Sequence, residues 1–493
     1  MRLVEGSNDM KQKLRIAIIG AGPGGLCMGI RLKQAGFEDF VIIDKGEAVG
    51  GTWYHNRYPG CACDIQSHLY SFSFEINRSW SRPYSPQPEI RAYFEYCAEK
   101  YGLVPHCRLG SGVVNAKWDE SSAKWTLILE SGEAIEADVV VGAVGMFNDI
   151  AMPDIPGLDS FEGTSFHSAR WNWDHDLTGE TVGVIGSAAS AVQFVPEIVK
   201  TAAQVDLYQR TANWVLPKED VPFTEEQLEH FRTDESAALE VRREVFESVD
   251  GGMTFEDPER LAETEMYGLG ALQVVEDEVT REKLRPQHPF GCKRPLLSND
   301  FYFAFNRPNL ELITEGVERI TKNSIVSSQG VERPIDTLIL ATGFAATKYL
   351  SSIDVEGRGG RSLDQAWSDG ATAYLGITTA GFPNLFMLYG PNTNNGSILT
   401  MIESQVEYAL RHIEHIANDG LAWIDVRPEP MMSYNEEVQT AIGNVQVWQA
   451  GCNGYYRTPS GRVVTQWPYS MTEFDRRTGR AELDLEVFEV ARR

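Results

Sequence analysis

Five charged residues occur where a chain usually carries its chemistry, directly after an apolar run or inside a loop rich in glycine or proline. They are Asp44, Asp64, Arg210, Lys293 and Arg294. A carboxylate can hydrogen-bond a ribose hydroxyl or hold a guanidinium, and a guanidinium can bind phosphate or stabilise developing negative charge. These residue types are candidates for a site that binds nucleotides. The simpler alternatives are that Asp64 caps a turn and that Arg294 is a surface residue.

Asp44 ends a strand–turn–helix–strand pattern that is typical of a dinucleotide-binding unit. The apolar run 16–19 is followed by a Gly-x-Gly-x-x-Gly turn made by Gly20, Gly22 and Gly25. The first glycine allows the tight turn, the second lets a pyrophosphate approach the backbone, and the third lets helix and strand pack closely. Asp44 follows Gly25 at about the ~20-residue spacing of a carboxylate that binds a ribose 2′-hydroxyl.

The same pattern recurs later in the chain with the charged position reversed. Gly186, Ala188 and Ala191 replace the three glycines, and Arg210 replaces Asp44. An arginine there accommodates a 2′-phosphate, so we expect FAD (or NAD) at the first turn and NADP at the second. Ala188 is irregular, because the middle glycine lets the backbone meet the pyrophosphate. The residues expected to bind cofactor at the second turn are Gly186, Ser187, Ala188, Ala191, Gln209, Arg210 and Thr211.

Composition argues against a nucleic-acid-binding, membrane-spanning or secreted protein. The net charge of −26 argues against a nucleic-acid partner or an anionic membrane surface. No apolar run approaches the ~20 residues of a membrane span, and residues 1–13 lack the apolar core of a signal peptide. The seven cysteines, an odd number without a repeating framework, suit a reducing cytoplasm. We therefore expect a cytoplasmic protein without stable membrane association. The sequence contains no cluster of metal ligands, so we expect no metal site, and it leaves open whether the protein is a monomer or a homodimer.

The order of the predicted elements indicates an α/β fold with two dinucleotide-binding (Rossmann-like) domains, the second inserted in the first, and a helical insertion. Two prolines and a glycine mark a boundary at 152–157, and 218–285 is acidic and rich in helix formers. The run 336–344 resembles 138–145, so we read it as the return to the first domain. The expected parts are an FAD-binding domain (14–152), an NADP-binding domain (153–217 and 286–334), the helical insertion (218–285) and the FAD-binding return segment with its tail (335–493).

With both turns placed, the chain resembles the class B flavoprotein monooxygenases and, within them, the type I Baeyer–Villiger monooxygenases. One fingerprint of that family, [A/G]-G-x-W-x4-[F/Y]-P-[G/M]-x3-D, is filled completely by Gly50, Gly51, Trp53, Tyr58, Pro59, Gly60 and Asp64. A second, F-x-G-x3-H-x3-W-[P/D], is filled by Phe161, Gly163, His167 and Trp171. Two departures are Asn172, where Pro or Asp is usual, and Gly454-Tyr455-Tyr456, where similar proteins often carry Ser-Trp-Tyr.

The resemblance implies an enzyme that uses FAD, NADPH and O2 to insert one oxygen atom beside a ketone carbonyl, giving an ester or lactone through a C4a-peroxyflavin. It implies that Arg294 is the fixed cation beside the flavin and that Asp64 holds it. Lys293 would help Arg210 bind the 2′-phosphate. The remaining residues expected to bind the first cofactor are Gly51, Thr52, Trp53 and Asp64.

Other readings stay open at this point. A heteroatom monooxygenase of the same class would oxidise amines or sulfides, although its members often have Tyr where Trp171 stands. A two-nucleotide flavin reductase, or a flavoprotein without turnover, would use the same two turns. We interpret His167 as a structural linker, Cys61 and Cys63 as ordinary buried thiols, and Trp53 equally as a packing residue or a cofactor contact.

Overall fold

The first of two parallel sheets carries the first glycine turn. In the computed structural model, residues 12–452, 454–480 and 483–493 are described. The strand order is β19-β7-β1-β2-β3, and every pair is parallel. Its strands are β1 (Ile16–Ile19), β2 (Phe40–Ile43), β3 (Cys107–Arg108), β7 (Val139–Gly142) and β19 (Leu385–Met387). Strands β1 and β7 are buried throughout, which is why they read as continuous apolar runs.

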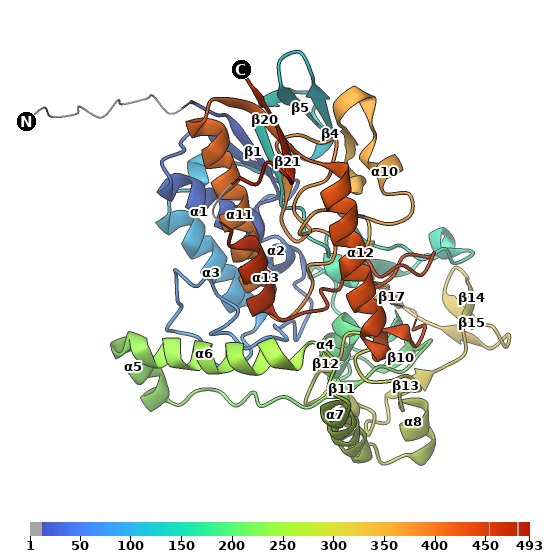
Figure 1. The fold of residues 1–493 in the computed structure, drawn as a ribbon. Coiled ribbons are helices and arrows are strands. Elements are labelled where there is room, and N and C mark those ends of the chain that lie inside the picture. The colour runs from blue at the N-terminus through green and yellow to red at the C-terminus, as the bar shows by residue number, and fades with distance from the viewer. Residues whose placement is uncertain (1–11, 453, 481–482) are drawn as a thin grey trace, which may run out of the picture.

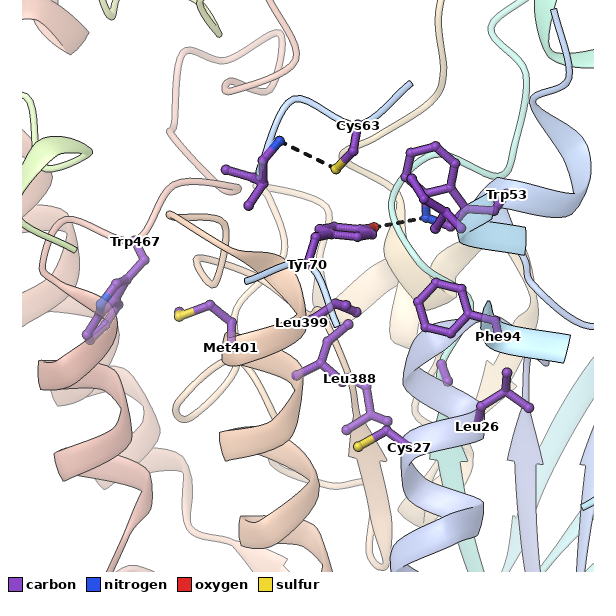
Figure 2. Close-up of a cluster of buried hydrophobic side chains, with 14 of the residues drawn as sticks. Leu26, Cys27, Trp53, Cys63, Tyr70, Phe94, Leu388, Leu399, Met401 and Trp467 are labelled. Carbon is purple, nitrogen blue, oxygen red and sulfur yellow. Dashed lines mark hydrogen bonds between the residues drawn. The ribbon is translucent and has the colours of Figure 1, made fainter. Parts of the chain in front are cut away.

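Two helices from opposite ends of the chain cover this sheet. Helix α1 (Pro23–Gln34) starts at the glycine turn and packs against α11 (Ile398–Asn418), as Figure 1 shows. The contact buries Leu26 and Cys27 of α1 together with Leu388 and Leu399, which Figure 2 places in one cluster. The tail therefore completes the core of the first domain.

The second parallel sheet has the strand order β13-β10-β9-β17-β8. Its strands are β8 (Thr164–His167), β9 (Thr181–Ile185), β10 (Gln204–Tyr208), β13 (Leu310–Ile313) and β17 (Thr337–Leu340). Our placement of 336–344 in the first domain was wrong, because β17 pairs with both β8 and β9. The chain returns to the first sheet only at β19. Helix α4 (Ala189–Ile198) follows β9, and α9 (Phe301–Ala304) packs against α4.

Smaller sheets and ribbons complete the β structure. A four-stranded sheet, β18-β4-β5-β6, is made by β4 (Val113–Asp119), β5 (Lys124–Leu129), β6 (Ala134–Ala137) and β18 (Asp354–Glu356). A three-stranded sheet contains β14 (Val317–Ile320), β15 (Ser324–Ser327) and β16 (Glu332–Pro334). Two-stranded pairs join β11 (Val215–Leu216) to β12 (Leu296–Leu297) and β20 (Leu421–Val426) to β21 (Phe488–Arg492).

The segment 218–285 is helical, as its composition predicts. It contains α5 (Glu225–Thr233), α6 (Glu235–Gly252), α7 (Pro258–Ala271) and α8 (Glu278–Lys283). Thr224 and Gln227 form a capping box at the start of α5, and Asp234, Asp257 and Asp277 cap the next three helices. In Figure 1, α6 runs beneath α1 and α3, at the edge of the first domain.

The remaining helices are α2 (Thr52–His55), α3 (Gln87–Lys100), α10 (Leu363–Ala366), α12 (Pro428–Asn444) and α13 (Met471–Thr478). Within the part of the chain that the structure describes, no helix combines the length and apolarity needed to cross a membrane. The expected absence of any disulfide framework needs a correction. Cys292 and Cys452 are bonded to each other, and the other five cysteines are free.

Candidate active site between the two glycine turns

A cavity of about 1300 Å³ opens between the two parallel sheets. Both glycine turns line it, together with the loop 51–65 and the C-terminal segment around Tyr455. Of the predicted site residues, those that line it are Gly20, Gly22, Asp44, Gly51, Thr52, Trp53, Asp64, Gly186, Ser187, Ala188, Gln209, Arg210, Thr211, Lys293 and Arg294. Tertiary structure thus brings together residues from both halves of the chain.

The first glycine turn and the loop beside it leave no room for a Cβ at Gly20, Gly25 and Gly51. Gly20 has a φ of +114°, and a Cβ there would lie 2.3 Å from the Ala143 carbonyl oxygen. A Cβ on Gly25 would lie 1.8 Å from the Gly20 oxygen. Gly51 also has a positive φ, and its Cβ would lie 2.7 Å from the Cα of Gly22. The result is a cradle of bare backbone at the N-terminus of α1, where free N–H groups favour phosphate.

Asp44 is held at the edge of this cradle. The Ala21 N–H donates to its Oδ2 at 2.6 Å, and the Gly46 N–H donates to its Oδ1 at 2.7 Å. Each carboxylate oxygen keeps a second lone pair for another donor. The side chain is therefore oriented in advance, with acceptor capacity left for a ribose hydroxyl.

The second turn repeats this geometry and explains the alanine in it. Gly186 has a φ of +107°, and a Cβ there would lie 2.3 Å from the Ala341 oxygen. Ala188, in contrast, has φ −92° and ψ −158°, close to the −75° and −175° of Gly22. Any residue can adopt that extended conformation. Ala188 is exposed, so its methyl group narrows the turn without straining it.

Two cations converge at the second turn without an acidic partner. Arg210 is exposed and Lys293 is half-buried, and neither forms an ion pair with any described residue. Burial and the nearby charge of Arg210 lower the pKa of Lys293. In a chain of net charge −26, two cations that repel each other indicate a site for an anion. Gln209 also lines the cavity, and its amide donates to the Lys283 carbonyl at 3.0 Å.

Arg294 and Asp64 form an ion pair on the wall of the cavity. Nη2 and Nε of Arg294 donate to Oδ2 of Asp64 at 2.8 and 3.2 Å. The arginine side chain is only 20% exposed. Burial alone would lower the pKa of Arg294, but the Asp64 carboxylate and the nearby Tyr455 and Tyr456 outweigh it and raise that pKa. Arg294 therefore keeps its positive charge, and two of its five N–H donors hold it in place.

The loop that carries Asp64 is held by contacts that the sequence did not reveal. Tyr58 donates to Oε1 of Gln193 at 3.0 Å, and Nε2 of Gln193 donates to the Ala62 carbonyl at 3.0 Å. Farther along, Nη1 of Arg242 in α6 donates to the carbonyls of residues 68, 69 and 71 at 2.9 to 3.0 Å. An arginine in an acidic helix gives no local signal of this role.

The aromatic fingerprint residues mostly serve packing. Trp53 lines the cavity but is only 6% exposed, and its Nε1 donates to the Tyr70 hydroxyl at 3.0 Å, as Figure 2 shows. Trp171 packs against Phe166 and Phe194 outside the cavity. Cys61 and Cys63 are buried free thiols, as we predicted.

The second fingerprint lies on and beside β8, an edge strand of the second sheet, and its four residues do not line the cavity. A Cβ on Gly163 would lie 2.3 Å from the Asp336 oxygen, so the chain needs glycine there. His167 ends β8, and its Nδ1 accepts the Ala169 N–H at 3.1 Å. Burial and the charge of Arg170 lower the pKa of His167 to about 4. The ring is therefore neutral at pH 7, which favours a structural role over acid–base catalysis.

We expect replacement of His167 by asparagine to flatten the pH dependence of stability. The pKa of this histidine falls from 6.5 in the unfolded chain to about 4 in the fold, so the unfolded state binds more protons between these values. The stability that depends on the neutral form of His167 is complete above pH 6.5 and is lost as the pH falls towards 4. Urea unfolding should show the wild type losing about 2 kcal/mol more than His167→Asn between pH 7 and pH 4.5. Parallel pH profiles would contradict the buried neutral state.

Comparisons with known proteins agree with this geometry. The family profile described as "Pyridine nucleotide-disulphide oxidoreductase" matches residues 17–255. A Baeyer-Villiger monooxygenase of Pseudomonas aeruginosa is 43% identical over 462 residues, which cover 92% of this chain and 87% of that protein. Among solved structures, OTEMO in complex with FAD and NADP has a TM-score of 0.88 at 28% identity, covering 98% and 100% of the two chains. Cyclohexanone monooxygenase from Rhodococcus sp. Phi1, bound to NADP+, has a TM-score of 0.87 at 28% identity, covering 97% and 99%.

The two parallel sheets, each with its glycine turn at one shared cavity, define a protein with two dinucleotide sites, and the likeness to the solved monooxygenase structures places it among the flavin monooxygenases. The identity to the Pseudomonas aeruginosa protein over most of both chains narrows the class further. This chain belongs to the Baeyer–Villiger monooxygenase family.

Proposed function

We propose that this protein is an FAD- and NADPH-dependent monooxygenase that inserts one oxygen atom of O2 beside the carbonyl of a small ketone, giving an ester or lactone. The observation that carries the proposal is the Arg294–Asp64 ion pair on the wall of a cavity that both glycine turns line. The cation is fixed, largely buried and adjacent to both predicted cofactor sites. Such an arrangement suits a reaction in which negative charge develops on a carbonyl oxygen.

The residues at the first turn fit FAD. In the cradle formed by Gly20, Gly22 and Gly51, a Cβ would clash at Gly20 and Gly51, and the cradle lies at the start of α1, where a pyrophosphate can approach the backbone. Asp44 is oriented at its edge with acceptor capacity for a ribose hydroxyl. When bound and reduced by NADPH, FAD supplies the oxygen chemistry. Thr52, Trp53 and Asp64 would form the wall beside it.

The residues at the second turn fit NADPH. Gly186, Ser187 and Ala188 would hold the pyrophosphate, while Arg210 and Lys293 would bind the 2′-phosphate. The lowered pKa of Lys293 supports this role, because a phosphate would relieve the repulsion from Arg210. Thr211 would add a hydroxyl at the same edge.

The chain itself orients the substrate and excludes water. Asp64 uses two N–H donors of Arg294, which leaves three for the carbonyl oxygen of a ketone. Tyr455 packs against Phe147 with ring centroids 5.5 Å apart, and Phe147 packs against Phe344 at 5.6 Å. These rings form an apolar wall of the cavity, where a charge–oxyanion contact is stronger than in water.

The proposal is tested by product analysis with a matched panel. The purified protein, loaded with FAD, receives NADPH, O2 and either a cyclic ketone, an amine or a sulfide of similar size. We expect about one ester per NADPH consumed with the ketone, because a fixed cation favours attack on a carbonyl. Faster formation of N-oxide or sulfoxide would assign the protein to the heteroatom class. Release of peroxide alone with every substrate would indicate a reductase or oxidase.

A further inference from the structure

A disulfide joins two segments that both line the candidate active site. Cys292 and Cys452 are separated by 160 residues in sequence, and their Cα atoms lie 6.0 Å apart. Cys292 directly precedes Lys293, and Cys452 belongs to the segment that carries Tyr455. The cross-link therefore connects the cationic side of the cavity to its aromatic side.

A row of aromatic rings runs beside this disulfide. The distances between ring centroids are 6.3 Å for Phe290 and Phe255, 6.2 Å for Phe255 and Trp448, and 6.5 Å for Trp448 and Tyr456. Tyr456 then contacts Tyr455 at 5.0 Å. The row leads from the helical insertion to the cavity, so packing and the covalent link hold the same two segments together. We call residues 446–452 and 454–457 the C-terminal wall.

The C-terminal wall lies beside the cations. A Cβ on Gly454 would lie 3.7 Å from Cγ of Lys293, so the backbone of the wall lies next to the lysine stem. Tyr455 and Tyr456 lie close enough to Arg294 to influence its pKa. Movement of the wall away from these side chains would therefore increase the exposure of Lys293 and Arg294 to water.

We propose that the Cys292–Cys452 disulfide is a redox-responsive latch, which holds the C-terminal wall over Lys293 and Arg294 when oxidised and releases it when reduced. The expected effect of the latch on catalysis rests on the proposed function. The latch itself is tested separately, by counting thiols and by measuring the mobility of the C-terminal wall. Reduced enzyme has a loosened cavity, so water enters, NADPH binds less well and more oxygen is released as peroxide.

The latch opens by reduction of the disulfide and closes by reoxidation of the two thiols. A dithiol reductant gives two electrons and two protons to the disulfide, which becomes two thiols while the dithiol becomes a disulfide. In the reverse direction, the two thiols give two electrons and two protons to hydrogen peroxide, which becomes two waters. Cys452 is only partly buried, so a small dithiol can reach it. Burial raises the pKa of Cys107 to about 11 and of Cys61 to about 12, which makes these free thiols poor competitors.

The first test counts thiols in the FAD-loaded protein, purified without reductant and alkylated in denaturant. We expect five modified cysteines before dithiothreitol and seven after it, because seven are present and five are free in the structure. Peptide mapping should find the cross-link between the peptides that contain Cys292 and Cys452. Seven modified cysteines in the untreated, air-exposed protein would overturn the proposal.

The second test measures amide hydrogen exchange of the C-terminal wall in oxidised wild type, dithiothreitol-reduced wild type, Cys292→Ser, Cys452→Ser and the control Cys107→Ser. We expect exchange in the reduced protein and in both latch variants to rise by about tenfold, with Cys107→Ser unchanged. Reduced wild type carries no substitution, so it tests the latch even if a variant folds poorly. Equal exchange in oxidised and reduced wild type would overturn the proposal.

The third test measures how the latch affects the active site. In the same samples, it determines the Michaelis constant for NADPH and the peroxide released per NADPH. Both should rise on reduction and in Cys452→Ser, and dithiothreitol should have no further effect on that variant. Unchanged values in samples whose wall exchanges faster would overturn the link between latch and site. If no ketone gives an ester in any sample, the proposed reaction fails, while the thiol count and exchange still decide the latch.

Discussion

Replacement of Arg294 by alanine should abolish most ester formation while the protein keeps its fold and its FAD. Asp64 fixes the charge of Arg294 on the wall of the cavity and uses two of its five N–H donors, which leaves three for a substrate oxygen. Loss of one preorganised donor to a developing oxyanion typically costs 10²–10³ in rate. We therefore expect kcat for ester formation to fall about 10²–10³-fold, measured by product per unit time at saturating ketone.

The fold should survive because Asp64, left without its partner, is 44% exposed and can be hydrated. Arg294→Lys keeps the charge but loses the two-donor contact with Asp64. Its kcat for ester formation should therefore lie between those of the wild type and Arg294→Ala. Arg285→Ala removes an exposed arginine on the helical insertion and serves as the matched control. Wild-type ester formation by Arg294→Ala would refute the role of this residue, whereas loss of bound FAD would show a structural one.

Replacement of Arg210 by alanine should raise the Michaelis constant for NADPH and leave that for NADH nearly unchanged. The two cofactors differ only in the 2′-phosphate, and Arg210 is an exposed cation at the cavity edge without an acidic partner among the described residues. A hydrogen bond to a charged group contributes about 1.5–3 kcal/mol. We expect an increase of about 10- to 100-fold for NADPH in initial-rate measurements.

Lys293→Ala should also raise the Michaelis constant for NADPH and not that for NADH. The increase should be smaller than in Arg210→Ala, because lysine offers a point charge whereas arginine offers a planar set of donors. Arg285→Ala again provides a control without effect. Since the charge of Arg210 helps to lower the pKa of Lys293, that pKa should rise in Arg210→Ala. Equal changes for NADPH and NADH would place Arg210 on the surface instead of on the phosphate.

Much of the nucleotide-binding plan could be predicted from sequence because it depends on local backbone geometry. The glycines at 20 and 186 adopt positive φ against a neighbouring carbonyl, and no other residue would fit without strain. Asp44 and Arg210 follow equivalent strands, β2 and β10, so their reversed charges distinguish two cofactors without any tertiary information. The alternation of buried strands and helices likewise indicates the α/β class.

Strand pairing was less predictable, because an apolar run that ends in a glycine fits either parallel sheet. The run at 337–340 looks like that at 139–142, yet β17 pairs with β8 and β9 while β7 pairs with β1. Only contacts between distant segments decide which sheet receives a strand. Our boundary at residue 335 was wrong for this reason.

The two glycine turns, the charge that follows each and the family fingerprints can be recognised in the sequence, since each depends on neighbouring residues. Tertiary structure alone decided that Arg294 meets Asp64 across 230 residues and that Cys292 meets Cys452 across 160. It also placed Trp171 and His167 outside the cavity, where they pack or support a strand end. A contact between distant segments depends on how whole sheets and helices pack, and no local pattern of residues encodes it.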